Sequence, residues 1–139
     1  MSAEDNLKIV QSYLANHDPR YMAEGATFRD YTQAEPVRGR KAIGEMLDTL
    51  YHTAFSEAVA ETRHVFADDT SVVLEFMFRG VNTGPLGDMP PTGKRVEVPM
   101  CAVYEVEGGQ IVRGHLYYDS GTMARQLGWQ PSAEDHPAR

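Results

Sequence analysis

The segment IVRGHLYYDSGTMARQL, residues 111–127, has the pattern of a last β-strand that leads into a short helix. Successive side chains of a strand alternate between its two faces, so Ile111, Arg113, His115, Tyr117 and Asp119 are predicted to share one face. Burying polar groups costs free energy unless they are hydrogen-bonded, which makes a His, a Tyr and an Asp on one face of this strand unusual. We therefore expect the chemistry of the protein here, with Asp119 at the end of a pocket.

The composition is typical of one soluble domain. The chain has 139 residues, of which 42% are hydrophobic and 24% charged, and this length is sufficient for a hydrophobic core. The formal net charge of -7 argues against nucleic acid or an anionic membrane surface as a partner, because both attract a basic face. The start MSAEDNLK lacks the pattern of a signal peptide, and no apolar run approaches the ~20 residues of a membrane span. We expect a soluble, cytoplasmic protein.

Hydrophobic periodicity predicts helices first and a sheet afterwards. Apolar residues at helical spacing predict helices over 3–17 and 39–54, and a period of two predicts strands over 56–66, 70–81, 95–106 and 110–119. A short strand over 26–31 and a helix over 121–127 complete the set. This order favours an α+β fold in which a curved, mainly antiparallel sheet wraps over the N-terminal helices around a cone-shaped cavity. Residues 1–128 are predicted to form one domain, and residues 129–139 a tail.

Asp119 has two interpretations. Desolvation in a pocket would raise its pKa and make it a general acid or base, whereas capping of the following helix would lower the pKa. A carboxyl group in an enclosed cavity would favour an enzyme, and one used only for capping would favour a binding module. His115 is a second catalytic candidate, but four residues along a strand span ~13 Å, which is too far for a hydrogen-bonded His–Asp dyad.

Glu75 interrupts the apolar run VVLEFMF. A carboxylate there must face a polar cavity or be paired, so we predict that it lines the pocket, with an ion pair to Arg79 as the alternative. The strand Val72–Phe78 is otherwise apolar at successive positions, which predicts a sheet covered on both faces and a homodimer. Further predicted pocket residues are Tyr31, Tyr51, Met77, Asn82 and Tyr117. Core packing is the alternative for Tyr31, Tyr51 and Met77. Tyr117 is either a hydrogen-bond donor to a substrate oxygen or a wall residue whose hydroxyl has a backbone partner.

Several motifs are absent from the sequence. The five histidines show no metal-ligand spacing, and the chain has neither a phosphate-binding Gly motif nor a nucleophile elbow. The single cysteine, Cys101, excludes an intrachain disulfide. We expect neither a metal nor a cofactor.

Several segments, in order and at matching spacing, resemble the SnoaL-like polyketide cyclases of the NTF2-like superfamily. They are Gly39–Ile43, Gly80–Pro85, Met89–Val96, Gly109–Val112, His115–Asp119 and Arg125–Gly128, and the resemblance covers roughly residues 5–128. Two positions depart from the family pattern: Asn82 occupies the place of a common histidine, and His115 that of a common tryptophan.

The resemblance implies a cone-shaped α+β barrel of the NTF2-like (cystatin-like) type that dimerises through the outer face of its sheet. It also implies cofactor-free ring closure by aldol chemistry, with Asp119 at the position of the family's general acid or base. The expected activity is proton transfer α to a carbonyl in a hydrophobic substrate of polyketide or terpenoid size, by cyclisation or isomerisation. The alternatives are a non-catalytic module for hydrophobic ligands or association, and a hydratase, dehydratase or hydrolase on the same fold.

Overall fold

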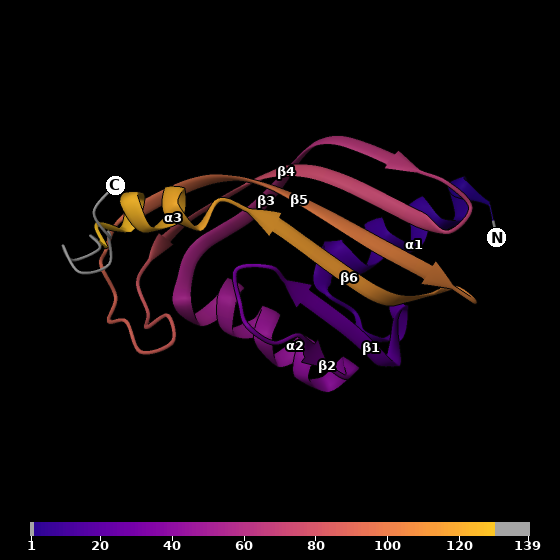
Figure 1. Cartoon of the computed structure of the whole chain (residues 1–139), viewed down its shortest axis with the longest axis horizontal. Coiled ribbons are helices and arrows are strands. Elements are labelled where there is room, and N and C mark those ends of the chain that lie inside the picture. Colours follow the sequence, from indigo (N-terminus) through magenta and orange to yellow (C-terminus); the bar gives the residue numbers. More distant parts are fainter. Residues whose placement is uncertain (1, 130–139) are drawn as a thin grey trace, which may run out of the picture.

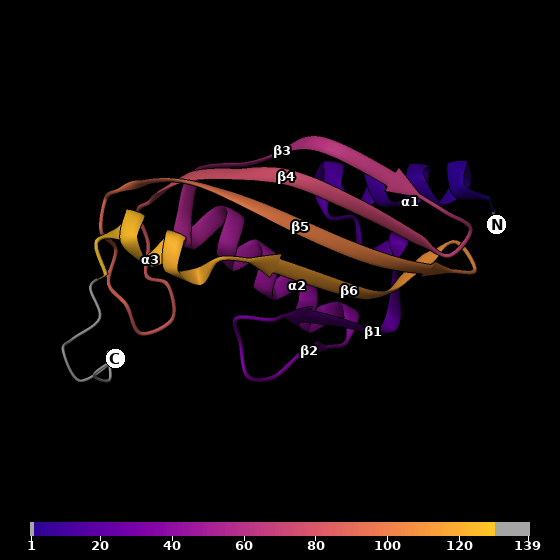
Figure 2. The same cartoon turned by 45° about the horizontal axis from the view of Figure 1, so that its top comes forward.

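The computed structural model describes residues 2–129, in which three α-helices accompany a six-stranded sheet (Figures 1 and 2). The predicted tail therefore falls, from residue 130 onward, outside the described residues. In chain order the elements are α1 (Ala3–Asn16), the 3-10 turn η1 (Pro19–Tyr21), β1 (Met22–Asp30), β2 (Val37–Arg38), α2 (Arg40–Asp48), the π-helical turn η2 (Thr49–Ala54), β3 (Phe55–Ala67), β4 (Ser71–Asn82), β5 (Arg95–Glu107), β6 (Gln110–Tyr118) and α3 (Ser120–Leu127).

The strands form one open, curved sheet in the order β2-β1-β6-β5-β4-β3. All neighbours are antiparallel except β1 and β6, which run parallel. The predicted α+β fold with a mainly antiparallel sheet is confirmed. The two-residue strand β2 was not predicted, because two residues are too few to show a period of two.

Helix α1 begins and ends at features that the sequence encodes locally. Ser2 caps its start, in a reciprocal capping box with Asp5. Its end is formed by His17, whose backbone is left-handed (φ 54°, ψ 42°) and whose N–H donates to the carbonyl of Tyr13. Asp18 and Pro19 then start the next turn, because the residue before a proline is disfavoured in the α region.

Helix α2 does not end at Asp48 but continues as η2, so the predicted extent of this helix is confirmed to within one residue. The π-helical winding of η2 is wider than that of an α-helix and occurs often at functional sites. It carries Tyr51 and His52. None of the helices within residues 2–129 is long and apolar enough to cross a membrane.

The core lies between the helices and the concave, inner face of the sheet. Val72 and Leu74 of β4 are buried there against Val10 and Tyr13 of α1, with Ile43 of α2 in the same hydrophobic cluster. These side chains alternate along β4, so one face of this strand builds the core.

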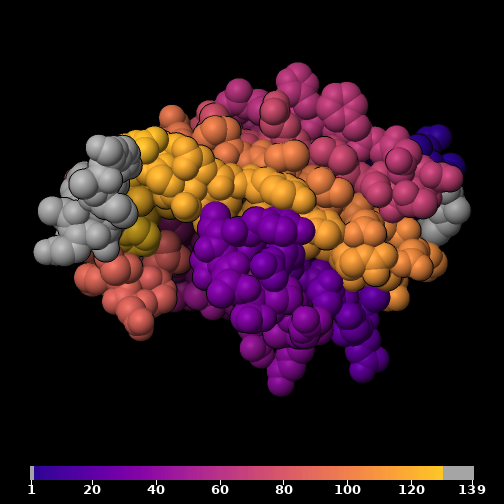
Figure 3. Space-filling view, viewed as in Figure 1, coloured from indigo at the N-terminus to yellow at the C-terminus, as the bar shows by residue number. Residues whose placement is uncertain are grey.

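The outer face of the sheet has a different composition. Glu75 and Arg79 of β4 lie on it, and Arg79 pairs at 3.0 Å with both Glu61 of β3 and Glu97 of β5. The prediction that β4 is apolar on both faces is therefore correct only in part, because Val73 and Met77 share the outer face with the two charges. In Figure 3 the atoms of β5 and β6 lie at the surface with no helix in front of them. A homodimer through this face stays a prediction.

Candidate functional site

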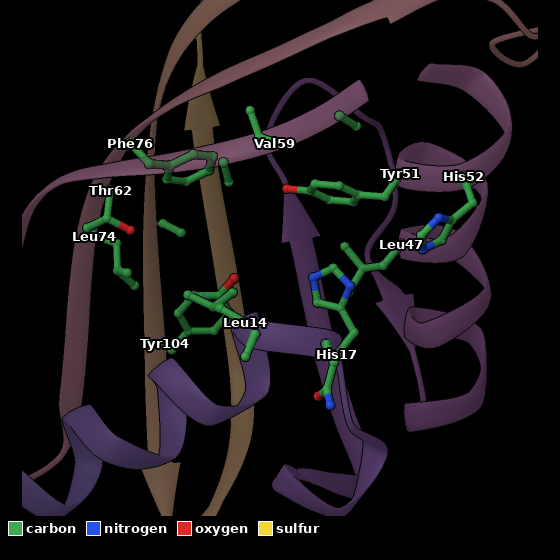
Figure 4. A pocket seen from close by; sticks show the side chains of 15 residues that line it. Leu14, His17, Leu47, Tyr51, His52, Val59, Thr62, Leu74, Phe76 and Tyr104 are labelled. Carbon is green, nitrogen blue, oxygen red and sulfur yellow. The ribbon is translucent and has the colours of Figure 1, made fainter. Parts of the chain in front are cut away.

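A cavity of ≈ 560 Å³ lies between the inner face of the sheet and the helices (Figure 4). Its wall combines the end of α1, the end of α2 with η2, and the inner face of β3, β4 and β5. The residues that line it are Leu14, Ala15, Asn16, His17, Leu47, Tyr51, His52, Ala58, Val59, Ala60, Thr62, Leu74, Phe76, Ala102 and Tyr104. A mostly apolar concave site with a few convergent polar groups is typical of small-molecule binding.

His17 reaches this cavity because of its backbone conformation. The left-handed region costs an L-residue roughly 1–2 kcal/mol and is normally occupied by glycine or asparagine at the end of a helix. In this chain it turns the half-buried ring of His17 beside Tyr51, with ring centroids 5.1 Å apart (Figure 4). Such strain is concentrated at functional sites, so the choice of histidine at this position indicates a role for its side chain.

The environment of His17 keeps its imidazole neutral. Burial lowers the pKa of His17, and the nearby His52 lowers it further. An imidazole whose pKa lies below its usual 6.5 is uncharged at neutral pH and offers a lone pair to a proton. His17 therefore has the protonation state that a general base requires.

Two tyrosine hydroxyls point into the same cavity from different walls (Figure 4). Burial raises the pKa of Tyr51 to about 12 and raises the pKa of Tyr104 further above its usual value. Tyr104 is only 7% exposed, and its hydroxyl has no hydrogen-bond partner within residues 2–129; the same holds for the hydroxyl of Tyr51. Neither oxygen is among the buried unpaired atoms of residues 2–129, so both hydroxyls are accessible and can hydrogen-bond to a molecule in the cavity.

Only Tyr51 among the predicted site residues lines the cavity. Sequence reasoning missed the roles of His17 and Tyr104, which it treated as part of a helical stripe and of a strand. The sequence places only the end of the helix here, because Pro19 restricts the backbone of Asp18, and it does not show where the ring of His17 lies. No signal in the sequence marks Tyr104 either.

Asp119 lies outside the cavity and caps α3. Its carboxylate accepts the N–H of Gly121 at 2.9 Å and the hydroxyl of Thr122 at 3.0 Å, and its side chain is exposed. The hydrogen bond from Thr122 and then that from Gly121 lower the pKa of Asp119. The prediction of a desolvated carboxyl group with a raised pKa is wrong, and the capping alternative is the one observed.

Glu75 and Met77 lie on the outer face of β4, not in the cavity. Glu75 is exposed and sits 3.7 Å from His64 of β3, while Arg79 pairs with other carboxylates. The predicted pocket position and its alternative, a pair with Arg79, are therefore both wrong. The alternation of β4 is the cause, because Leu74 and Phe76 take the cavity side.

Asn82 is fully buried and has a structural role. Its amide donates at 3.0 Å to the carbonyls of Ala54 and Gly84, and its side-chain oxygen accepts the N–H and hydroxyl of Thr92. These bonds tie the loop after β4 to the end of η2. The prediction that Asn82 contacts substrate is not supported by this geometry.

The structure brings together three predicted residues, Tyr31, His115 and Tyr117, on the outer face of the sheet. The ring of Tyr31 stacks on that of Tyr117 at 4.7 Å, and its hydroxyl lies 3.1 Å from Nδ1 of His115. Nε2 of His115 lies 2.7 Å from Glu105. This cluster is separated from the cavity by the sheet, so these residues do not line the pocket for which they were predicted.

A β-bulge explains why the predicted face of β6 is only partly correct. Arg113 pairs with Glu105, whereas Ile111 pairs with Val106, so one strand carries an extra residue between these pairs. An extra residue reverses the alternation. Ile111 is therefore buried in the core, while Arg113 and the residues after it at spacing two face outward.

Metal ligation has no candidate in the described part of the chain, residues 2–129, where no three His, Cys, Asp or Glu side chains form a group suited to a metal ion.

Comparisons with known proteins bear on this site and fold. The sequence model of a family described as SnoaL-like polyketide cyclase matches residues 12–127. Among curated proteins no sequence matches this chain significantly.

Solved structures with the same fold come from several kinds of protein. A SnoaL-like protein from Jannaschia sp. CCS1 superposes with a TM-score of 0.81 at 16% identity, over 93% of this chain and 95% of that one. An epoxide hydrolase of LEH-like type from M. tuberculosis gives 0.71 at 19% identity, over 90% of both chains. A protein of ketosteroid isomerase-like fold from Catenulispora acidiphila gives 0.69 at 18% identity, over 89% of this chain and 98% of that one.

Proposed function

Because the chain belongs to the SnoaL-like polyketide cyclase family, we propose that it is a small-molecule enzyme that moves a proton α to a carbonyl group inside the cavity. In this proposal His17 is the general base, and the hydroxyls of Tyr51 and Tyr104 hold the carbonyl oxygen. The observation that carries the proposal is the pair of unpartnered hydroxyls directed into a cavity that a neutral histidine also faces.

The reaction follows from these protonation states. A ring nitrogen of His17 takes the proton from the α carbon, and the C–H electron pair forms the double bond of an enolate whose charge rests on oxygen. The tyrosine hydroxyls remain protonated, because their pKa values are raised, and so they can donate to that oxygen as its charge grows. The enolate carbon then attacks a second carbonyl carbon of the same substrate, and the oxygen that receives the π electrons takes the proton back from His17. In a substrate with a β,γ double bond the intermediate is a dienolate, and His17 returns the proton to its γ carbon instead.

The apolar wall contributes to the same chemistry. Leu14, Leu47, Leu74 and Phe76 lie among the polar groups of the wall. An apolar substrate that displaces water from these groups would strengthen each hydrogen bond to the developing charge. A base of this type contributes about 10²–10⁴-fold to a rate, and one donor to an oxyanion about 10²–10³-fold.

Proton exchange tests the proposal without knowledge of the natural substrate. The uncharged ketone 2-tetralone is incubated with the protein in deuterium oxide, and mass spectrometry measures deuterium uptake at its α carbons above the protein-free rate. We expect uptake to be accelerated by the natural chain and to fall to background with His17→Gln.

The matched control is His115→Gln, the same substitution on the outer face of the sheet, which should leave uptake unchanged. Equal uptake by the natural chain and by His17→Gln would refute the role of His17. Acceleration that depends on His115 instead would move the chemistry to the outer face.

A non-catalytic binding module is the second candidate, and the capping role of Asp119 favours it. With its carboxylate used by Gly121 and Thr122, no aspartate or glutamate lines the cavity. A ligand that binds in the cavity without any acceleration of exchange would support this candidate over the enzyme.

A further inference from the structure

The wall of the cavity contains no permanently charged side chain. Its lining residues include no lysine, arginine, aspartate or glutamate. The ionisable groups are two histidines and two tyrosines, of which His17 has a lowered pKa and Tyr51 and Tyr104 have raised ones. A lowered pKa of a histidine and a raised pKa of a tyrosine both favour the uncharged form of the side chain.

The wall carries three hydroxyl groups that can donate hydrogen bonds. The hydroxyls of Tyr51 and Tyr104 lack partners within residues 2–129, and Thr62 directs a third hydroxyl toward the cavity from β3 (Figure 4). Each of them can donate to an acceptor oxygen of a ligand. Without a cation on the wall, an anionic oxygen would lose its hydration without gaining a counter-charge.

We infer that the cavity binds uncharged ligands with carbonyl or ether oxygens and rejects their anionic counterparts. This inference rests on the proposed function, because it concerns the same cavity, and it adds that the ligand is uncharged. The net charge of -7 acts in the same direction, because it lowers the local concentration of anions around the protein.

A matched pair of fluorescent probes tests the inference. N-phenyl-1-naphthylamine is uncharged, and 8-anilinonaphthalene-1-sulfonate is the same molecule with a sulfonate that stays charged over the whole pH range of the protein. Both brighten in apolar surroundings. We expect the uncharged probe to bind at least about 100-fold more tightly, since an unpaired buried charge costs several factors of ten in affinity.

Two variants locate the probe and supply the missing charge. Ala60→Trp fills the cavity from β3 and should abolish the signal of the uncharged probe. Thr62→Lys adds a cation to the wall and should raise the affinity for the sulfonate at least about tenfold. Gln33→Lys places the same charge on an exposed loop residue and should change neither affinity.

The outcomes separate this inference from the proposed function. Equal or tighter binding of the sulfonate, abolished by Ala60→Trp, would overturn the charge selectivity while leaving the exchange assay unaffected. A signal of the uncharged probe that survives Ala60→Trp would also overturn the inference, because the probe would then lie elsewhere. Loss of exchange activity with the selectivity intact would refute the enzyme and keep the ligand class.

Discussion

Replacing His17 by glycine separates the function of this residue from its place in the fold. Glycine adopts φ near 54° without steric cost, so His17→Gly relieves roughly 1–2 kcal/mol of backbone strain. Two effects oppose this. The greater entropy of the unfolded glycine chain lowers the free energy of unfolding by about 0.5–1 kcal/mol, and the loss of the ring contacts with Tyr13 and Tyr51 lowers it by about 1 kcal/mol. The free energy of unfolding should therefore change by less than about 1 kcal/mol.

Activity should respond differently from stability. Thermal unfolding by circular dichroism should give a melting temperature within about 5 °C of the natural chain, while deuterium uptake by 2-tetralone should fall about 10²–10⁴-fold. His17→Asn is the control for side-chain size, because asparagine also tolerates the left-handed region but is not a base. It should lose activity to the same extent.

The opposite result would refute this reasoning. A melting temperature lowered by more than about 10 °C with activity retained would mean that the ring of His17 is a structural group. In that case the strain at His17 would serve the packing of α1 against η2.

The same geometry supports five further predictions. Tyr104→Phe should lower exchange about 10²-fold without a loss of stability, since its hydroxyl has no protein partner; kinetics and a thermal melt check this. The pH profile of exchange should stay flat down to the usual histidine pKa of 6.5 and fall only below it, because burial lowers the pKa of His17; a fall already above pH 6.5 would contradict this. The free energy of unfolding should also fall as the pH drops below the pKa of His17 in the unfolded chain. The reason is that the unfolded chain binds a proton at His17 at higher pH than the folded chain does. Asp119→Ala should lower the melting temperature through the lost cap and leave exchange unchanged, and a loss of exchange in a folded protein would restore Asp119 to the mechanism. Asn82→Ala should cost about 2–4 kcal/mol in urea denaturation, because it removes buried hydrogen bonds from Ala54, Gly84 and Thr92.

The period and order of the hydrophobic residues predicted most elements of the fold. Helical spacing over 39–54 and a period of two in the strands after residue 55 depend on local geometry alone, and the observed elements agree with them within a few residues. The cap at Ser2 and the end of α1 before Pro19 are local features too, so they were predictable as well.

The functional side chains were harder to predict because a strand pattern does not say which of its faces is the inner one. In β4 both faces carry apolar residues, and only the packing of α1 and α2 assigns Leu74 and Phe76 to the cavity and Glu75 and Met77 to the outside. In β6 a single bulged residue separates Ile111 from Arg113 and reverses the predicted face.

The sequence by itself therefore determined the class of fold, the family and the approximate bounds of the elements, since these depend on interactions between near neighbours in the chain. Only the tertiary structure decided which polar groups meet. His17, Tyr51 and Tyr104 come from three separate segments, and their protonation states arise from burial that no single segment can supply. The cap that Asp119 forms with Gly121 and Thr122 is local, and the sequence already offered it as an alternative, but the tertiary structure showed that this side chain lies outside the cavity.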